Sequence, residues 1–188
     1  MNRTVKIALI IVGITLAICC LAFFGGYLFL KRQFDVVADP DQARTMAHSI
    51  TDYTLPSGYS EQFGFRVANL FTYVVIAPTT NEQDGMLFVL AQGPDDAGFD
   101  PDTARTTVEG QVGRRMEGVQ QTEERTVTIR GEERTMLIFE GTDAESGEAM
   151  RMAFVSFTGN DGPAFLLVIS PSRAWDEEAL NQFIASMR

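Results

Sequence analysis

The chain is poor in the side chains that enzymes most often use as nucleophiles, bases or metal ligands. It has a single histidine, His48, and its two cysteines, Cys19 and Cys20, both lie in an apolar run near the N-terminus. No lysine occurs beyond residue 32. Without these residue types, most schemes of covalent catalysis and metal-dependent hydrolysis lack their usual parts. The sequence therefore favours a noncatalytic protein over an enzyme.

Catalytic and nucleotide-binding motifs are also missing. The chain contains no G-x-S-x-G nucleophile elbow and no G-x-x-x-x-G-K-[ST] phosphate loop. His48 has Asp52 four residues later, but side chains at this spacing on a helix usually form a solvated polar face. A hydrolase that uses carboxylates alone, such as Glu61 or Glu140, is the remaining enzymatic alternative. We predict no catalytic residue and no cofactor.

Positive charge is scarce in most of the chain. Residues 33–188 contain 11 arginines and all 25 acidic residues, so their net charge is 11 − 25 = −14. Nucleic-acid binding depends on lysine and arginine side chains that neutralise phosphates. The acidic balance therefore argues against a nucleic-acid partner, and it also disfavours a domain that lies flat on anionic lipid.

Residues 7–30 carry no charge at all. A helix of these 24 residues would be roughly 36 Å long, enough to cross a hydrocarbon core of about 30 Å. We predict a transmembrane helix in contact with membrane lipid here, between a tail of residues 1–6 and a juxtamembrane linker of residues 31–38. A cleaved signal peptide is the alternative, although its apolar region usually spans only about 7–15 residues.

The surroundings of the apolar run predict its topology. Two basic residues lie close to each of its ends, so the positive-inside rule is nearly balanced, and the acidic remainder favours export. We predict a single-pass protein of the cytoplasmic membrane, with residues 39–188 forming an extracytoplasmic domain. Within the run, Gly13 with Ala17 and Ala22 with Gly26 are pairs of small residues that suit close approach of another helix.

Two similar heptapeptides predict the starts of two helices: DPDQART at residues 39–45 and DPDTART at residues 100–106. In each, the first Asp suits the cap, Pro suits the first helical position, and the second Asp faces the positive end of the helix dipole. Apolar residues then recur at spacings of three and four; in the second copy they are Ala104, Val108, Val112 and Met116. A third helix, capped by Ser172, is predicted at the C-terminus.

Between these helices the sequence has the composition and the boundaries of strands. We predict strands at residues 63–67, 71–77, 86–92, 124–130, 134–140, 150–158 and 164–170. Gly131 and the segment GNDGP at residues 159–163 predict hairpin turns. The expected fold class is α+β, with an N-terminal transmembrane helix followed by an antiparallel β-sheet packed with about three helices.

This order of helix, strands, helix, strand meander and final helix resembles the PsbP/Mog1-like fold. The ending AFLLVISPSRAWDEEALNQFIASM, residues 164–187, is similar to the last strand and packing helix of such domains. The chain also looks like bacterial membrane-anchored proteins with one small exported domain. Members of the PsbP/Mog1-like family serve as binding or assembly modules with varied partners, so the resemblance implies a binding or assembly role. It supplies no catalytic motif.

Four aromatic residues on the early strands are a candidate partner surface, with core packing as the alternative: Phe63, Phe65, Phe71 and Tyr73. Two acidic stretches offer oxygen ligands for a weak calcium site, although neither has the spacing of a known calcium loop; they contain Asp95, Asp96, Asp100 and Asp102, and Asp143, Glu145 and Glu148. Met150, Met152 and Met136 have thioethers that suit Cu(I), but methionine commonly fills cores. We predict no metal.

Together these features predict a noncatalytic, single-pass membrane protein that presents an extracytoplasmic binding or assembly module to a protein partner. The first alternative is an accessory subunit of a larger membrane complex, associated through residues 7–30. The second alternative is the carboxylate-dependent hydrolase.

Overall fold

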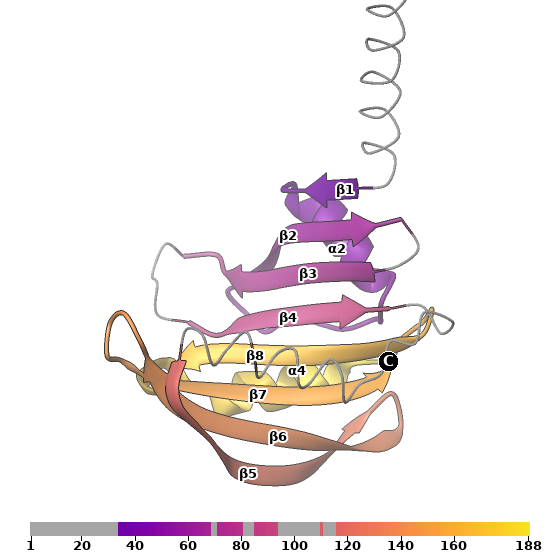
Figure 1. Ribbon diagram of the computed structural model, residues 1–188. Helices are drawn as coiled ribbons and strands as arrows, with labels where there is room; N and C mark the ends of the chain where they lie inside the picture. The colour runs from indigo at the N-terminus through magenta and orange to yellow at the C-terminus, as the bar shows by residue number, and fades with distance from the viewer. Residues whose placement is uncertain (1–33, 69–70, 81–84, 94–109, 111–115) are drawn as a thin grey trace, which may run out of the picture.

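The computed structural model describes residues 34–68, 71–80, 85–93, 110 and 116–188. Most of them form one antiparallel sheet of eight strands in the order β1-β2-β3-β4-β8-β7-β6-β5. The strands are β1 (Phe34–Val37), β2 (Tyr59–Val67), β3 (Phe71–Pro78), β4 (Leu87–Gln92), β5 (Met116–Ile129), β6 (Glu132–Asp143), β7 (Ala149–Thr158) and β8 (Pro163–Pro171). The α-helices α2 (Pro40–His48) and α4 (Glu177–Ser186) both lie behind the sheet in Figure 1, and the 3₁₀ turn η1 (Ser172–Ala174) follows β8.

Helix α2 begins where the first heptapeptide predicts. Asp39 Oδ1 accepts hydrogen bonds from two backbone N–H groups of the first turn, both at 3.1 Å, and Pro40 occupies the first helical position. The apolar face of the helix is buried against the sheet, at Ala43, Met46 and Ala47. The helix approaches β2 closely at Gly64, where a Cβ atom would lie 2.9 Å from Met46 Sδ.

Alternation along the strands gives the sheet two faces with different environments. On the face covered by the helices, paired positions run across the sheet from Val37 through Gly64, Val74, Leu90, Leu166 and Val155 to Met136. Phe183 of α4 is fully buried on this face, where its ring meets those of Tyr53 and Phe88. This covered face contains the main hydrophobic core.

Both hairpins predicted from turn residues are present. Strands β5 and β6 are joined at Arg130 and Gly131, whose φ angles are 54° and 79°. Two successive positive φ angles are typical of the type I′ turn that suits twisted strands. Strands β7 and β8 are joined through a turn in which the Gly159 N–H donates to the Gly162 carbonyl at 2.8 Å.

The fold class predicted from the sequence is wrong in its helices. The described residues are mostly strands, with two α-helices of 9 and 10 residues instead of about three helices. At 1.5 Å per residue each helix is about 15 Å long, half the thickness of a hydrocarbon core. In the part of the chain that the structure describes, no helix is long and apolar enough to cross a membrane. The structure does not support the predicted transmembrane, single-pass assignment of residues 7–30, which lie outside the described ranges.

Other helix predictions also differ from the structure. The helix predicted from residues 100–106 lies outside the described residues, apart from Gly110, which is helical, and Met116, which begins β5 and pairs with Asp143. The last helix starts later than predicted because Trp175 is extended (ψ 115°) after η1, and Asp176, in place of Ser172, accepts a hydrogen bond from a first-turn N–H at 3.0 Å. Residues 34–37, assigned to the linker, form the edge strand β1.

Candidate functional site

The four aromatic residues predicted as a partner surface lie on the face of the sheet opposite the helices, which is turned toward the viewer in Figure 1. Phe63 and Phe65 come from β2, and Phe71 and Tyr73 come from β3, with Phe65 directly opposite Tyr73 in the register. All four are half-buried. The structure therefore brings these residues together, and we refer to them as the aromatic patch.

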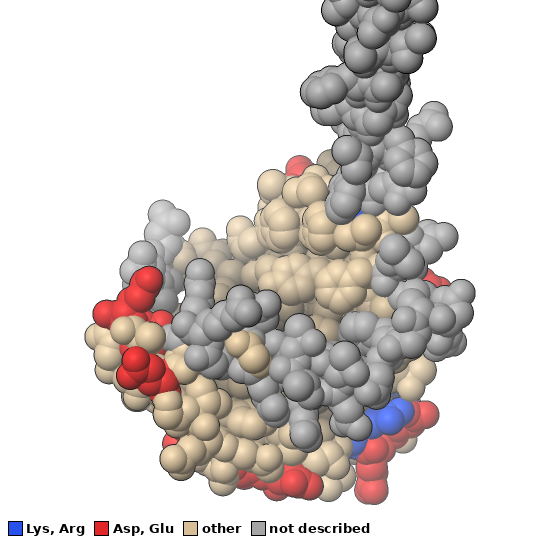
Figure 2. All heavy atoms as spheres, in the orientation of Figure 1, with Lys and Arg blue, Asp and Glu red and all other residues tan. Residues whose placement is uncertain are grey.

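The aromatic patch belongs to an uncharged surface. Among the described residues, strands β2, β3, β4, β8 and β7 place no charged side chain on this face. Paired positions run from Val36 through Phe65, Tyr73 and Ala91 to Phe165, and from Phe63 through Val75, Val89, Leu167 and Phe154 to Leu137. Figure 2 shows the uncharged surface over β2 and β3, with acidic side chains at the margins of the molecule.

Packing within the aromatic patch changes from its centre to its edge. The rings of Phe71 and Tyr73 are stacked, with centroids 6.4 Å apart and an interplanar angle of 24°. Both rings pack against buried residues farther along this face, and burial raises the pKa of the Tyr73 hydroxyl. At the sheet edge Val36 is 59% exposed. The aromatic patch is therefore packed against buried residues on the side of Phe71 and Tyr73, and it is more exposed toward the sheet edge at Val36.

Glu61, proposed as a hydrolase carboxylate, lies on the covered face instead. A register irregularity between Glu61 and Phe63 separates the two faces within β2. Glu61 is 1% exposed, its Oε1 accepts a hydrogen bond from the Tyr53 hydroxyl at 2.8 Å, and its Oε2 lies 3.4 Å from Arg44 Nε. Oε2 accepts no hydrogen bond. Burial first, and the Glu61 carboxylate second, raise the pKa of Tyr53 far above its ordinary value.

This raised pKa makes stability sensitive to alkaline pH. In the unfolded chain Tyr53 ionises at about pH 10, whereas the folded protein keeps the proton. Above that pH the unfolded state binds fewer protons, so the free energy of unfolding falls by up to about 1.4 kcal/mol per pH unit for this group. Between about pH 10 and pH 11, we expect the free energy of unfolding to fall less steeply in the Tyr53→Phe variant than in the wild type. At neutral pH the variant should be less stable than the wild type by about 1.5–3 kcal/mol, because Glu61 loses a hydrogen bond.

Urea denaturation of the wild type and the variant across this pH range measures the difference between their free energies of unfolding. Tyr59 and Tyr73 also have raised pKa values, but they are present in both proteins, so their contributions cancel in the comparison. Parallel pH dependences for the wild type and the variant would show that Tyr53 does not carry the effect.

The two carboxylates of the hydrolase alternative are far apart. Glu61 is on β2 and Glu140 is on β6, and five inter-strand steps separate these strands in the sheet order. At about 4.8 Å per step, the two strands lie roughly 24 Å apart. Glycoside hydrolysis by paired carboxylates requires a separation of roughly 5–10 Å. Glu140 lies instead 3.8 Å from Arg151 Nε, so the two glutamates do not form a catalytic pair.

His48 takes part in local packing at the end of α2. Its Nδ1 lies 3.0 Å from Asp52 Oδ1, and its ring stacks on Tyr53 with centroids 4.9 Å apart. The spacing of four residues predicted this polar pairing, but the stacking contact had no signal in the sequence.

The residues considered for metal binding do not converge. No group of three His, Cys, Asp or Glu side chains among the described residues is placed to hold a metal ion. Asp143 Oδ1 accepts three hydrogen bonds within the β6–β7 turn, and Glu148 pairs with Arg173 at 3.0 Å. Met152 is buried on the face of the aromatic patch, whereas Met136 is buried in the core of the covered face. The other acidic stretch, with Asp95, Asp96, Asp100 and Asp102, lies outside the described residues.

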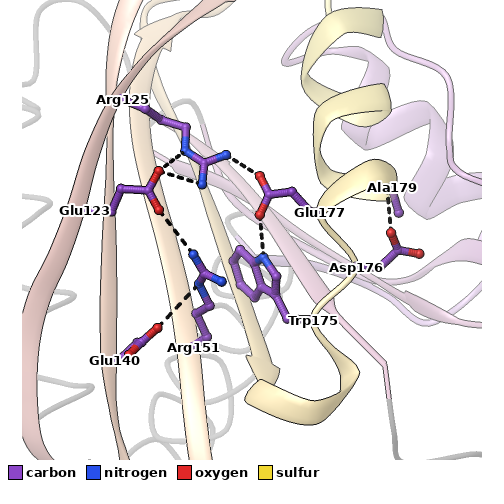
Figure 3. Close-up of polar contacts among 8 residues, drawn as sticks. All are labelled: Glu123, Arg125, Glu140, Arg151, Trp175, Asp176, Glu177 and Ala179. Carbon is purple, nitrogen blue, oxygen red and sulfur yellow. Dashed lines mark hydrogen bonds and ion pairs between the residues drawn. The ribbon is translucent and has the colours of Figure 1, made fainter.

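A charged network joins the start of α4 to the sheet (Figure 3). Arg125 donates to Glu123 at 2.9 Å and also to Glu177, whose other oxygen accepts from Trp175 Nε1 at 2.9 Å. Arg151 donates to Glu123 at 3.3 Å and lies 4.9 Å from the centre of the Trp175 ring. Burial opposes ionisation of Glu177, but the hydrogen bonds from Trp175 and Arg125 outweigh it and lower the pKa of Glu177. These side chains partner one another, so the network positions α4.

A cavity of about 340 Å³ opens where β2 and β4 end and β3 begins, beside the β7–β8 turn. Arg66 donates from Nη2 to Ser49 Oγ at 2.6 Å and from Nε to Thr72 Oγ1 at 3.2 Å. The cavity is lined by Ser49, Arg66, Ala68, Phe71, Thr72, Gln92, Gly93 and Asp161, and we refer to it as the strand-end cavity. Sequence reasoning missed it because its residues come from separate segments that share no local motif.

Comparisons with known proteins add little to this geometry. No protein-family model matches the chain, and no curated protein matches it. Among solved structures it is similar to the crystal structure of LpqN, a protein involved in cell envelope biogenesis of Mycobacterium tuberculosis. The identity is 12%, the match covers 85% of this chain and 93% of that chain, and the TM-score is 0.39. The resemblance to PsbP/Mog1-like domains stays a prediction.

Proposed function

We propose that this protein is a noncatalytic binding or assembly module that docks a protein partner on the aromatic patch. The observation that carries the proposal is the partial exposure of four aromatic side chains on an uncharged face of the sheet. Contiguous exposed apolar surface marks interaction sites in soluble domains. Aromatic residues also supply much of the binding energy at protein interfaces.

The contrast between the two sheet faces supports a role for the patch beyond folding. On the covered face, α2 and α4 leave the aromatic ring of Phe88 with no exposed area. On the other face, Phe63 and Phe65 remain partly exposed and Val36 beside them is 59% exposed. Burying this surface in an interface would remove apolar area from water, at about 25 cal/mol for each Å². An apolar partner surface of matching shape fits these properties.

An extracytoplasmic location is part of the proposal. The uncharged run at residues 7–30, preceded by Arg3 and Lys6, is typical of segments that direct export, whether they are retained or removed. A reporter enzyme fused after Arg188 should be active only outside the cytoplasm. Activity only in the cytoplasm would contradict this part of the proposal and leave the docking surface to be tested separately.

Photo-crosslinking in cells tests the docking surface. A photoreactive residue at Phe65 of the full-length protein should capture one defined protein, and the additional substitution Tyr73→Ser should reduce that capture. The matched control carries the photoreactive residue at Glu178, which is exposed on α4 at the opposite side of the sheet. Equal capture from the two positions, or capture from Phe65 that Tyr73→Ser leaves unchanged, would reject the proposal.

A further inference from the structure

We propose that the strand-end cavity binds a small molecule that carries both a carboxylate and an amino group, a free amino acid in its simplest form. Arg66 would hold the carboxylate, and Asp161 would hold the ammonium group. This inference rests mainly on polar residues at the strand ends, although Phe71 of the aromatic patch also lines the cavity. Either proposal can fail while the other stands.

Among the described residues, no carboxylate lies within ion-pair distance of Arg66, although Asp35 is opposite it in the register of β1 and β2. Five other arginines lie within 4.0 Å of a carboxylate: Arg44, Arg125, Arg134, Arg151 and Arg173. The guanidinium of Arg66 is held by two neutral hydroxyl groups, those of Ser49 and Thr72. These contacts fix the plane of the guanidinium and leave its other N–H donors for a ligand. A planar guanidinium in a fixed position suits the two oxygens of a carboxylate.

The buried side-chain amide of Gln92 lines the same cavity as Arg66. Gln92 is only 5% exposed. Its Nε2 donates to the Gly162 carbonyl at 3.2 Å, and a Cβ atom at Gly159 would lie 2.7 Å from the same nitrogen. The β7–β8 turn therefore holds the amide in place. Fixed polar groups in a cavity orient a ligand without the entropic cost of ordering flexible side chains.

The backbone at the cavity wall is in an unusual conformation. Ala68 has φ 43°, in the left-handed region that residues other than glycine seldom adopt. Such conformations are concentrated at ligand sites, where the surrounding structure maintains them. Ala68 and the ring of Phe71 give the cavity an apolar side, which suits the aliphatic side chain of an amino acid.

Asp161 decides the class of ligand. Its carboxylate is exposed at the cavity, where it disfavours a simple anion such as phosphate and favours an ammonium group. Opposite charges on Arg66 and Asp161 therefore match a zwitterion. The cavity volume of about 340 Å³ lies near the lower limit of ligand pockets, which range over roughly 300–1,000 Å³.

Calorimetric titration of the full-length protein with three matched probes tests the assignment. L-leucine should bind, whereas leucinamide, which lacks the carboxylate, and 4-methylpentanoate, which lacks the amino group, should each bind at least about 10-fold more weakly. Arg66→Gln should weaken L-leucine binding by at least about 10-fold. Arg173→Gln is the matched control, because Arg173 pairs with Glu148 at 3.0 Å and neither residue lines the cavity, and it should leave binding unchanged.

Two further measurements keep the proposal falsifiable if Arg66→Gln does not fold. Asp161→Asn should weaken binding of L-leucine without weakening that of 4-methylpentanoate. In the wild type, the side-chain amide resonances of Gln92 should shift when L-leucine is added. Absence of L-leucine binding at millimolar concentration, equal binding of L-leucine and leucinamide, or binding that leaves the Gln92 resonances unmoved would each overturn the proposal.

Discussion

Replacing Phe183 by alanine is expected to lower the free energy of unfolding by about 3–5 kcal/mol. Its side chain is fully buried, and its ring centroid lies 5.1 Å from that of Tyr53 and 4.8 Å from that of Phe88. The residue therefore ties α4 both to the sheet and to the segment that follows α2. Removal of the ring leaves a cavity in the covered core that these rigid neighbours cannot fill. Urea denaturation of the full-length protein, followed by Trp175 fluorescence, measures the loss.

The matched control is Phe65→Ala on the other face of the sheet. Phe65 is half-buried, so the same change removes fewer contacts and should cost about 1 kcal/mol. Comparable losses at the two positions would contradict the assignment of the covered face as the main core.

Replacing Tyr73 by serine is expected to weaken binding of the partner captured at Phe65 by about 30-fold or more, which corresponds to a hot-spot loss of about 2 kcal/mol. Tyr73 is central to the aromatic patch, since it faces Phe65 across the register and stacks on Phe71. Serine removes the ring from both contacts and exposes a hydroxyl in its place. Affinity is measured with the purified partner and the full-length variant.

Gln62→Ser provides the control for this loss. Gln62 is exposed at the irregularity in β2, where its amide donates to Ser60 Oγ at 2.6 Å. The substitution changes the same strand outside the aromatic patch, so affinity should stay within about twofold of the wild type. A Tyr73→Ser protein that folds and binds as tightly as this control would remove the patch from the interface.

Local signals in the sequence were sufficient for the elements that local chemistry determines. Asp39 and Pro40 predicted the start of α2, and Gly131 predicted the β5–β6 turn, because caps and turns depend on neighbouring residues. Alternation also placed Phe71 and Tyr73 on one face, since successive strand residues point to opposite faces. The prediction that the four aromatic residues share a surface followed from this regularity.

Features that depend on distant contacts were not predictable in this way. Ser172 and Asp176 are both suitable caps, and the choice of Asp176 follows contacts of Trp175 and Glu177 with the distant Arg125 and Arg151. The strand β1 has four residues and is identified by its pairing with β2. The strand-end cavity likewise exists only when four separate segments meet.

The predicted end of the second helix was wrong for a related reason. Periodicity at residues 100–116 favoured a helix, yet Met116, at its end, is part of a 14-residue strand paired with β6. The long β5–β6 pairing overrides the local preference of that residue. Tertiary pairing of this kind is invisible to a window of seven residues.

Hydroxyl-radical footprinting of the full-length protein, alone and with the captured partner, tests most directly whether the aromatic patch is a docking surface. The account predicts oxidation of Phe63, Phe65 and Tyr73 in the free protein and their protection in the complex, while Phe88 and Phe183 stay protected in both. Patch residues that are as protected as Phe183 in the free protein, or equally oxidised in both states, would contradict it.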